Sequence, residues 1–184
     1  LAALLFHEMA HQITYVQNDT AFNESFAKTV EMEGLRRWCE SSGSDDLWNE
    51  YLQREAQSAG FHSLLATVRN DLRKVYTAEY INDQKRLAKK EILNRAFADY
   101  ETLKASWDGY DGFDDWMSRG LNNARLSSMA SYYDLVPAFQ TLLRQVDHDL
   151  NKFYAEVIAL GALPETERLT RLQALTPSLR ASLK

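Results

Sequence analysis

The chain begins with Leu1-Ala2-Ala3-Leu4-Leu5-Phe6-His7-Glu8-Met9-Ala10-His11. This stretch is the most informative part of the sequence for both the local fold and the chemistry. It contains no glycine or proline and consists mainly of good helix formers, so it predicts an α-helix. Residues four apart lie on one face of a helix, which turns both histidines the same way. Two imidazoles at this spacing can share one Zn²⁺, with Glu8 between them as general base. The alternative is a core helix whose histidines bond backbone carbonyls.

A catalytic zinc site usually takes a third protein ligand and leaves one position for water. Asp19-Thr20 predicts the start of a second helix that continues to about Ser41. Glu24 lies near the first turn of that helix, with twelve residues between it and His11. Glu31 follows Glu24 by seven residues, two helical turns, and therefore shares its face.

The identity of the third ligand stays open between three carboxylates on this second helix. We favour Glu24, because a short connection from His11 allows a simple hairpin return. Glu31 or Glu33 could serve instead, over a longer connection. A carboxylate that binds no metal is expected on a solvated helix face, and this applies to Glu33 in particular.

The run Asn23-Glu24-Ser25-Phe26-Ala27-Lys28-Thr29-Val30-Glu31 resembles the N-E-G-F-A-x-x-x-E segment of gluzincin aminopeptidases. The resemblance implies that His7, His11 and Glu24 bind Zn²⁺ and that Glu8 is the general base. It also implies that Glu31 and Asn23 support the zinc ligands through contacts behind them. The departure is the spacing, since those enzymes typically place about eighteen residues between the second histidine and the glutamate, against twelve here.

The longer stretch from Leu4 to Ala27 more closely resembles a bacterial family described as putative aminopeptidases, in the same metallopeptidase clan. The resemblance continues through residues 121–124 and 133–139. It implies a peptide substrate, a bacterial periplasmic or envelope location, and an upstream β-sheet segment. The chain starts at Leu1, shortly before the histidine motif. We therefore expect this chain to be the part of a longer protein that contains the zinc site, and to lack the upstream β-sheet.

Length and composition predict one mainly α-helical, zincin-like domain over residues 1–184. Seven glycines and three prolines disfavour a β-rich fold with many tight turns. Within the domain, residues 1–41 would form the zinc-binding helix pair, and residues 42–184 a helical bundle that completes the cleft. The net charge of −5 gives no reason to expect a nucleic-acid partner, and no apolar run reaches the roughly 18 residues of a membrane span.

Further helices are expected near residues 46–80, 82–106, 122–134, 138–160 and 164–175. Trp107 to Trp116 is rich in aromatic, aspartate and glycine residues and predicts a loop. We interpret this loop as a capped turn with aromatic anchors. The alternative is a lip of the substrate cleft.

The predicted reaction is zinc-dependent peptide-bond hydrolysis, in which zinc and Glu8 activate a water molecule. The oxyanion that develops on the attacked carbonyl needs a hydrogen-bond donor opposite the metal. Tyr133 is the first candidate for this donor and Tyr132 the second. Aminopeptidase activity follows from the resemblance alone. The alternatives are a zinc endopeptidase and a zinc-stabilised helical binding module without catalysis.

Overall fold

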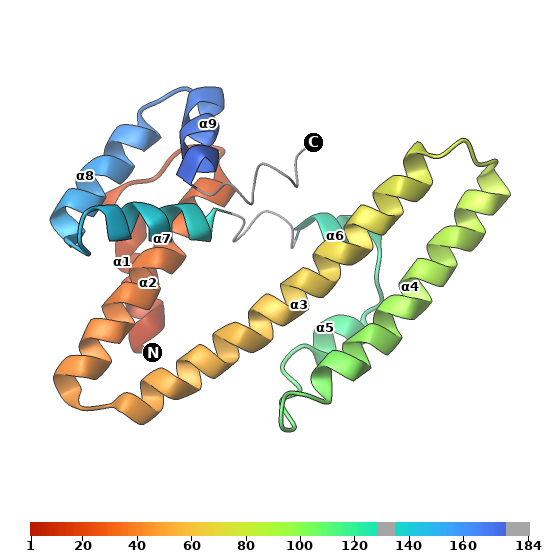
Figure 1. The fold of residues 1–184 in the computed structure, drawn as a ribbon, viewed down its shortest axis with the longest axis horizontal. Helices are drawn as coiled ribbons and strands as arrows, with labels where there is room; N and C mark the ends of the chain where they lie inside the picture. The colour runs from red at the N-terminus through yellow and green to blue at the C-terminus, as the bar shows by residue number, and fades with distance from the viewer. Residues whose placement is uncertain (129–134, 176–184) are drawn as a thin grey trace. The chain divides into compact units, whose positions relative to one another are not determined.

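A computed structural model describes residues 1–128 and 135–175 and shows a mainly α fold within those ranges (Figure 1). The helical fold class predicted from the sequence is therefore confirmed. No strand occurs in the described residues, and none of their helices is long and apolar enough to cross a membrane. The helices are α1 (Ala2–Ile13), α2 (Thr20–Ser42), α3 (Asp45–Thr77), α4 (Asn82–Lys104), α5 (Asp114–Ser118), α6 (Asn123–Ser128), α7 (Val136–Gln145), α8 (Leu150–Gly161) and α9 (Glu165–Leu175).

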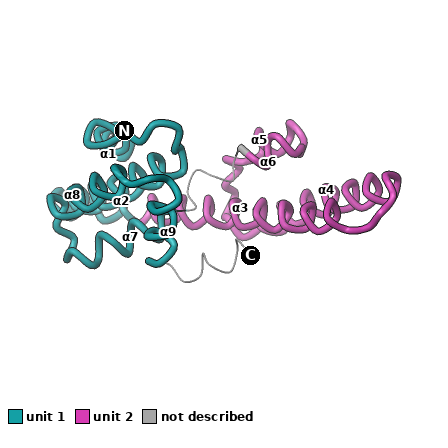
Figure 2. Tube along the Cα trace, turned by 90° about the horizontal axis from the view of Figure 1, so that it is seen from above, with its two compact units in different colours: residues 1–48, 131–184 teal, residues 49–130 magenta. Residues whose placement is uncertain are grey.

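The chain divides into two compact units, each with its own hydrophobic core (Figure 2). Unit 1 comprises residues 1–48 and 131–184, and unit 2 comprises residues 49–130. The histidine motif and the second helix both belong to unit 1. All the residues predicted to bind metal are therefore supplied by one unit.

Helices α1 and α2 pack against each other as a hairpin, and the residues between them explain the turn. Thr14 ends α1 in an extended conformation, and Asn18 adopts a positive φ of 64°. Asp19 then caps α2 by accepting a hydrogen bond from the Phe22 N–H at 3.0 Å. The helix start predicted at Asp19-Thr20 is confirmed, and it brings Glu24 back alongside α1.

The core of unit 1 covers the other side of α2. Arg168 of α9, which is 5% exposed, forms an ion pair with Asp19 at 2.7 Å and so ties α9 to the start of α2. Phe26 packs against the rings of Phe139 and Phe153 from α7 and α8. The fully buried members of this core, with no exposed surface, are Ala10, Phe22, Phe26, Ala27, Ala138, Phe139, Phe153 and Val157. Together these contacts fix α2 as the frame for the residues it presents toward α1.

Unit 2 is built on α3 and α4, whose facing sides are apolar. The Trp107–Trp116 segment packs its rings onto this core: Phe113 stacks on Phe61 with ring centroids 4.1 Å apart, and Trp107 is 6% exposed. The aromatic anchors predicted for this segment are confirmed.

Helix boundaries depart from the expectations in three places. Helix α5 begins at Asp114, inside the segment expected as a loop. The stretch expected as helical over residues 138–160 is two helices, α7 and α8, because Asp147 and His148 have φ of 54° and 58°. These left-handed residues make the turn between them. Of the helix expected at 122–134, the structure describes only α6, and the remainder lies outside the described residues.

Candidate metal centre

His7, His11 and Glu24 converge between α1 and α2. The Nε2 atom of His7 lies 3.3 Å from Oε2 of Glu24, and the Nε2 atom of His11 lies 3.8 Å from its Oε1. One donor atom from each residue falls within 4.8 Å of the other two, close enough for all three to hold one metal ion. Both imidazoles therefore turn the same nitrogen toward a single carboxylate.

Glu31 stands behind His7. Its Oε2 atom lies 3.1 Å from Nδ1 of His7, while its Oε1 atom accepts a hydrogen bond from Lys28 Nζ at 2.8 Å. A carboxylate on Nδ1 holds the proton there and leaves Nε2 as the free lone pair. This contact thus orients the ring.

His11 is held differently. Its Nδ1 atom is buried and has no hydrogen-bond partner within residues 1–128 and 135–175. The ring instead contacts His7 edge-on, with centroids 5.1 Å apart, and Tyr15 at 6.4 Å. Packing orients this second imidazole, whereas a hydrogen bond orients the first.

Asn23 lies beside the site but binds the α1–α2 loop. Its side-chain amide accepts from the Val16 N–H and donates to the Val16 carbonyl, both at 2.8 Å. The side chain is 1% exposed, so these two bonds satisfy polar groups that are shielded from water. Asn23 therefore holds the hairpin closed, and its contact is with the loop backbone rather than with a histidine.

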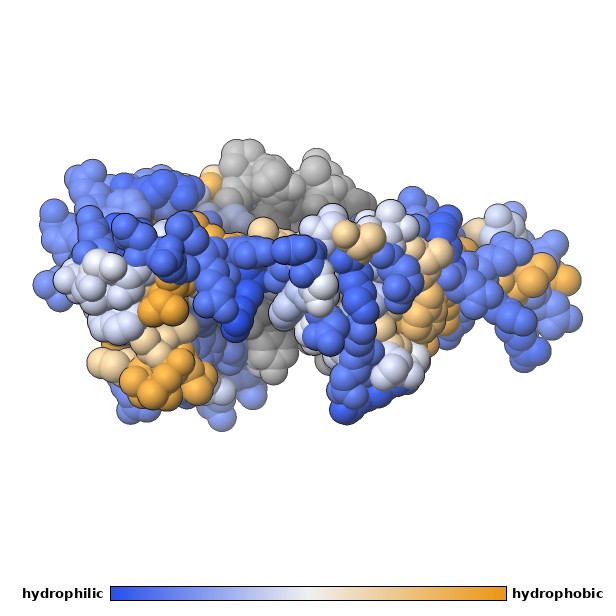
Figure 3. Space-filling model, turned by 90° about the horizontal axis from the view of Figure 1, so that it is seen from below, coloured by the Kyte–Doolittle hydropathy of each residue, from blue (hydrophilic) through white to orange (hydrophobic). Residues whose placement is uncertain are grey.

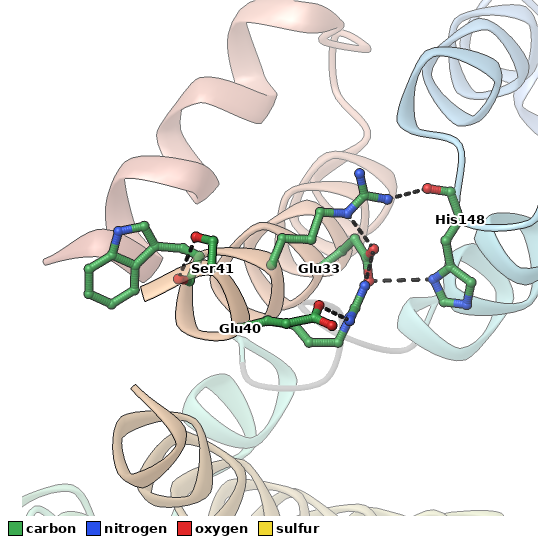
Figure 4. Close-up of polar contacts among 7 residues, drawn as sticks. Glu33, Glu40, Ser41 and His148 are labelled. Carbon is green, nitrogen blue, oxygen red and sulfur yellow. Dashed lines mark hydrogen bonds and ion pairs between the residues drawn. The ribbon is translucent and has the colours of Figure 1, made fainter. Parts of the chain in front are cut away.

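Glu33 belongs to a different cluster of charges (Figure 4). Its carboxylate accepts hydrogen bonds from Arg36 Nε at 3.1 Å and Arg37 Nε at 2.7 Å, and it lies 3.4 Å from His148 Nδ1. Arg37 also donates to the His148 carbonyl. Burial raises the pKa of Glu33, but the hydrogen bonds and charges of Arg36 and Arg37 outweigh it and lower the pKa to about 2. The expectation of a solvated position for Glu33 is wrong, since only 5% of it is exposed.

Comparison with known proteins gives the family. Residues 1–172 match the model of the family described as Putative aminopeptidase. The chain belongs to that family. No curated protein and no solved structure matches it. The family supplies a coarse function, that of an aminopeptidase that acts on peptides.

In this family member, Glu8 is exposed on α1 and has no hydrogen bond or ion pair with any other described residue. It follows His7 directly in the helix, so it projects beside the histidines and into solvent. Tyr133 and Tyr132, the predicted oxyanion donors, lie outside the described residues.

An apolar groove of about 770 Å³ runs along the other flank of α1, away from the histidines. Its walls include Phe6, Met9 and Ile13 from α1, Gly34 and Trp38 from α2, and Tyr154 from α8. Leu1, Leu4, Leu5 and Met9 are each more than half exposed. Figure 3 shows a patch of hydrophobic residues at the lower left of the view. Helix α1 thus presents His7 and His11 to the candidate metal centre and also forms part of the wall of an open apolar groove.

Proposed function

We propose that the protein is a zinc-dependent aminopeptidase of the gluzincin type, with Zn²⁺ held by His7, His11 and Glu24. The observation that carries the proposal is the convergence of both Nε2 atoms on Glu24, with Glu31 on the far nitrogen of His7. The HExxH helix and the glutamate helix are adjacent in sequence and form one hairpin. A connection of twelve residues is thus long enough for this geometry.

The residues present fit a catalytic zinc ion. Two imidazole nitrogens and one carboxylate oxygen are donors that zinc prefers, and three protein ligands leave a fourth position for water. The side chains of His7, His11 and Glu24 are 14%, 19% and 22% exposed, so the cluster is partly buried yet open to solvent. That exposure favours a catalytic site over a closed structural one.

Each residue then has a distinct task. When bound, zinc would polarise the scissile carbonyl and lower the pKa of water at the site toward neutrality. Glu8 would accept the proton of the attacking water and deliver it to the departing amine. Glu31 would keep the His7 Nδ1 proton in place, so that Nε2 stays directed at the site.

The experiment is hydrolysis of aminoacyl chromogenic amides by the purified protein before and after chelation, with zinc added back. We expect activity that chelation abolishes and zinc restores. Activity that persists through chelation would contradict the proposal. Cleavage of an N-acetylated peptide at a comparable rate would show an endopeptidase, whereas bound zinc without any hydrolysis would indicate a binding module.

A further inference from the structure

Helices α1 and α2 make an unusually close contact at Gly34, which packs against the ring of Phe6. A Cβ atom placed on Gly34 would lie 2.6 Å from Phe6 Cγ, 2.7 Å from Cδ1 and 3.1 Å from Cδ2. Separations under 3.0 Å are essentially never found for real Cβ atoms. Since Cγ is only two bonds from the Phe6 backbone, swinging the far end of the ring cannot relieve the overlap.

This contact adjoins the candidate metal centre. Phe6 immediately precedes His7, and Gly34 follows Glu31 by three residues on α2, within one helical turn. Glycine is less favourable than alanine inside a helix, so its presence within α2 calls for a packing reason. The Phe6 ring provides one, because only a residue without a side chain allows it to lie there.

We infer that Gly34 is a positioning residue that sets the separation of α1 and α2 and so places His7 for metal binding. The inference rests on the zinc site proposed above. A side chain at position 34 would push Phe6, and with it α1, away from α2. The contacts of His7 with Glu24 and Glu31 would lengthen together. Zinc–nitrogen bonds tolerate deviations of only about 0.2 Å, so a small displacement of the helix would weaken the site.

The test compares Gly34→Ala with Gly60→Ala, measuring zinc affinity by chelator competition and the visible spectrum of the Co²⁺-substituted protein. Gly60 is the matched control, because it also lies inside a helix but its added Cβ would meet Leu103 at an ordinary 3.5 Å. We expect Gly34→Ala to bind zinc at least about tenfold more weakly, with an altered Co²⁺ spectrum and unchanged helical content. Gly60→Ala should match the parent protein in every measurement.

A second variant distinguishes positioning from a general loss of stability. Phe6→Ala removes the ring that the new methyl group would strike, so Phe6→Ala/Gly34→Ala should bind zinc within about threefold of Phe6→Ala alone. If Gly34→Ala does not fold, the double variant tests the inference in its place, since the double variant should fold and bind zinc.

Three results would overturn the inference. The first is that Gly34→Ala binds zinc and Co²⁺ as the parent does, which would mean that Phe6 turns into the neighbouring groove and leaves α1 in place. The second is that the double variant binds zinc no better than Gly34→Ala does. Finally, a parent protein that binds no zinc would remove the proposed function itself, and the inference with it.

Discussion

The imidazole of His7 is held between two carboxylates of one helix, with Nδ1 3.1 Å from Glu31 Oε2 and Nε2 3.3 Å from Glu24 Oε2. Glu24 and Glu31 are separated by two turns of α2 and therefore share a face. One rigid element thus supplies both the third candidate ligand and the group that orients the first. The seven-residue interval between the glutamates has a direct structural reason.

Replacing Glu31 should weaken metal binding without removing a ligand. Glu31→Gln keeps the shape of the side chain but replaces the charged acceptor of the His7 Nδ1 proton, and supporting carboxylates of this kind are worth about 10–100-fold in metal affinity. We expect a loss in that range by chelator competition. Glu40→Gln is the control, because Glu40 also lies on α2 but pairs with Arg36 at an exposed position. Equal affinity for the two variants would show that Glu31 does not support His7.

Replacing Glu8 should separate metal binding from catalysis. Glu8→Gln cannot accept a proton, and general bases typically contribute about 10²–10⁴-fold to the rate. The variant should keep the zinc affinity and helical content of the parent while kcat falls by at least about 100-fold. Retention of kcat would assign the proton transfer to another group.

The amide of Asn23 should be important for stability. Asn23→Ala would leave both the N–H and the carbonyl of Val16 without their partner in a partly buried position. We expect the free energy of unfolding to fall by about 2–4 kcal/mol in urea titrations. Asn94→Ala, an exposed change within α4, should stay within about 0.5 kcal/mol of the parent. A similarly small effect for Asn23→Ala would show that the loop closes without it.

Glu33 should make the stability of the protein sensitive to acid. Its pKa is about 2 in the folded chain against 4.5 for the free group, so its stabilisation is complete well above pH 4.5 and is lost as the pH falls through 2. Between pH 7 and pH 3 this contribution should decrease by about 2 kcal/mol. The free energy of unfolding of the parent should therefore fall more steeply over that interval than that of Glu33→Gln. Parallel curves would mean that Arg36 and Arg37 do not hold Glu33 in this way.

Much of the hairpin could be predicted from the sequence, because its determinants are local. A helix without breakers around His7 and His11, and a capping aspartate at position 19, define the two helices and the turn. Once the turn is short, Glu24 must return to the level of the histidines. The relation of Glu31 to Glu24 follows from helical periodicity alone.

The interactions that depend on packing could not be predicted in this way. Nothing in the sequence near Glu33 reveals its contact with His148, which lies more than a hundred residues later. The sequence alone therefore predicts that Glu33 is exposed to solvent, whereas it is buried. The bond from Asn23 to Val16 depends on the exact path of the loop. The contact between Gly34 and Phe6 depends on how closely two helices approach, which the pattern of either helix does not specify.

The most direct test of this account is the zinc content of the purified protein after dialysis, measured beside Glu24→Gln and Glu33→Gln. We predict one tightly held Zn²⁺ per chain for the parent and for Glu33→Gln, and a loss of affinity of at least about 100-fold for Glu24→Gln. A parent protein without stoichiometric zinc, or a Glu24→Gln variant that retains zinc as tightly as the parent, would show that His7, His11 and Glu24 do not form a zinc site.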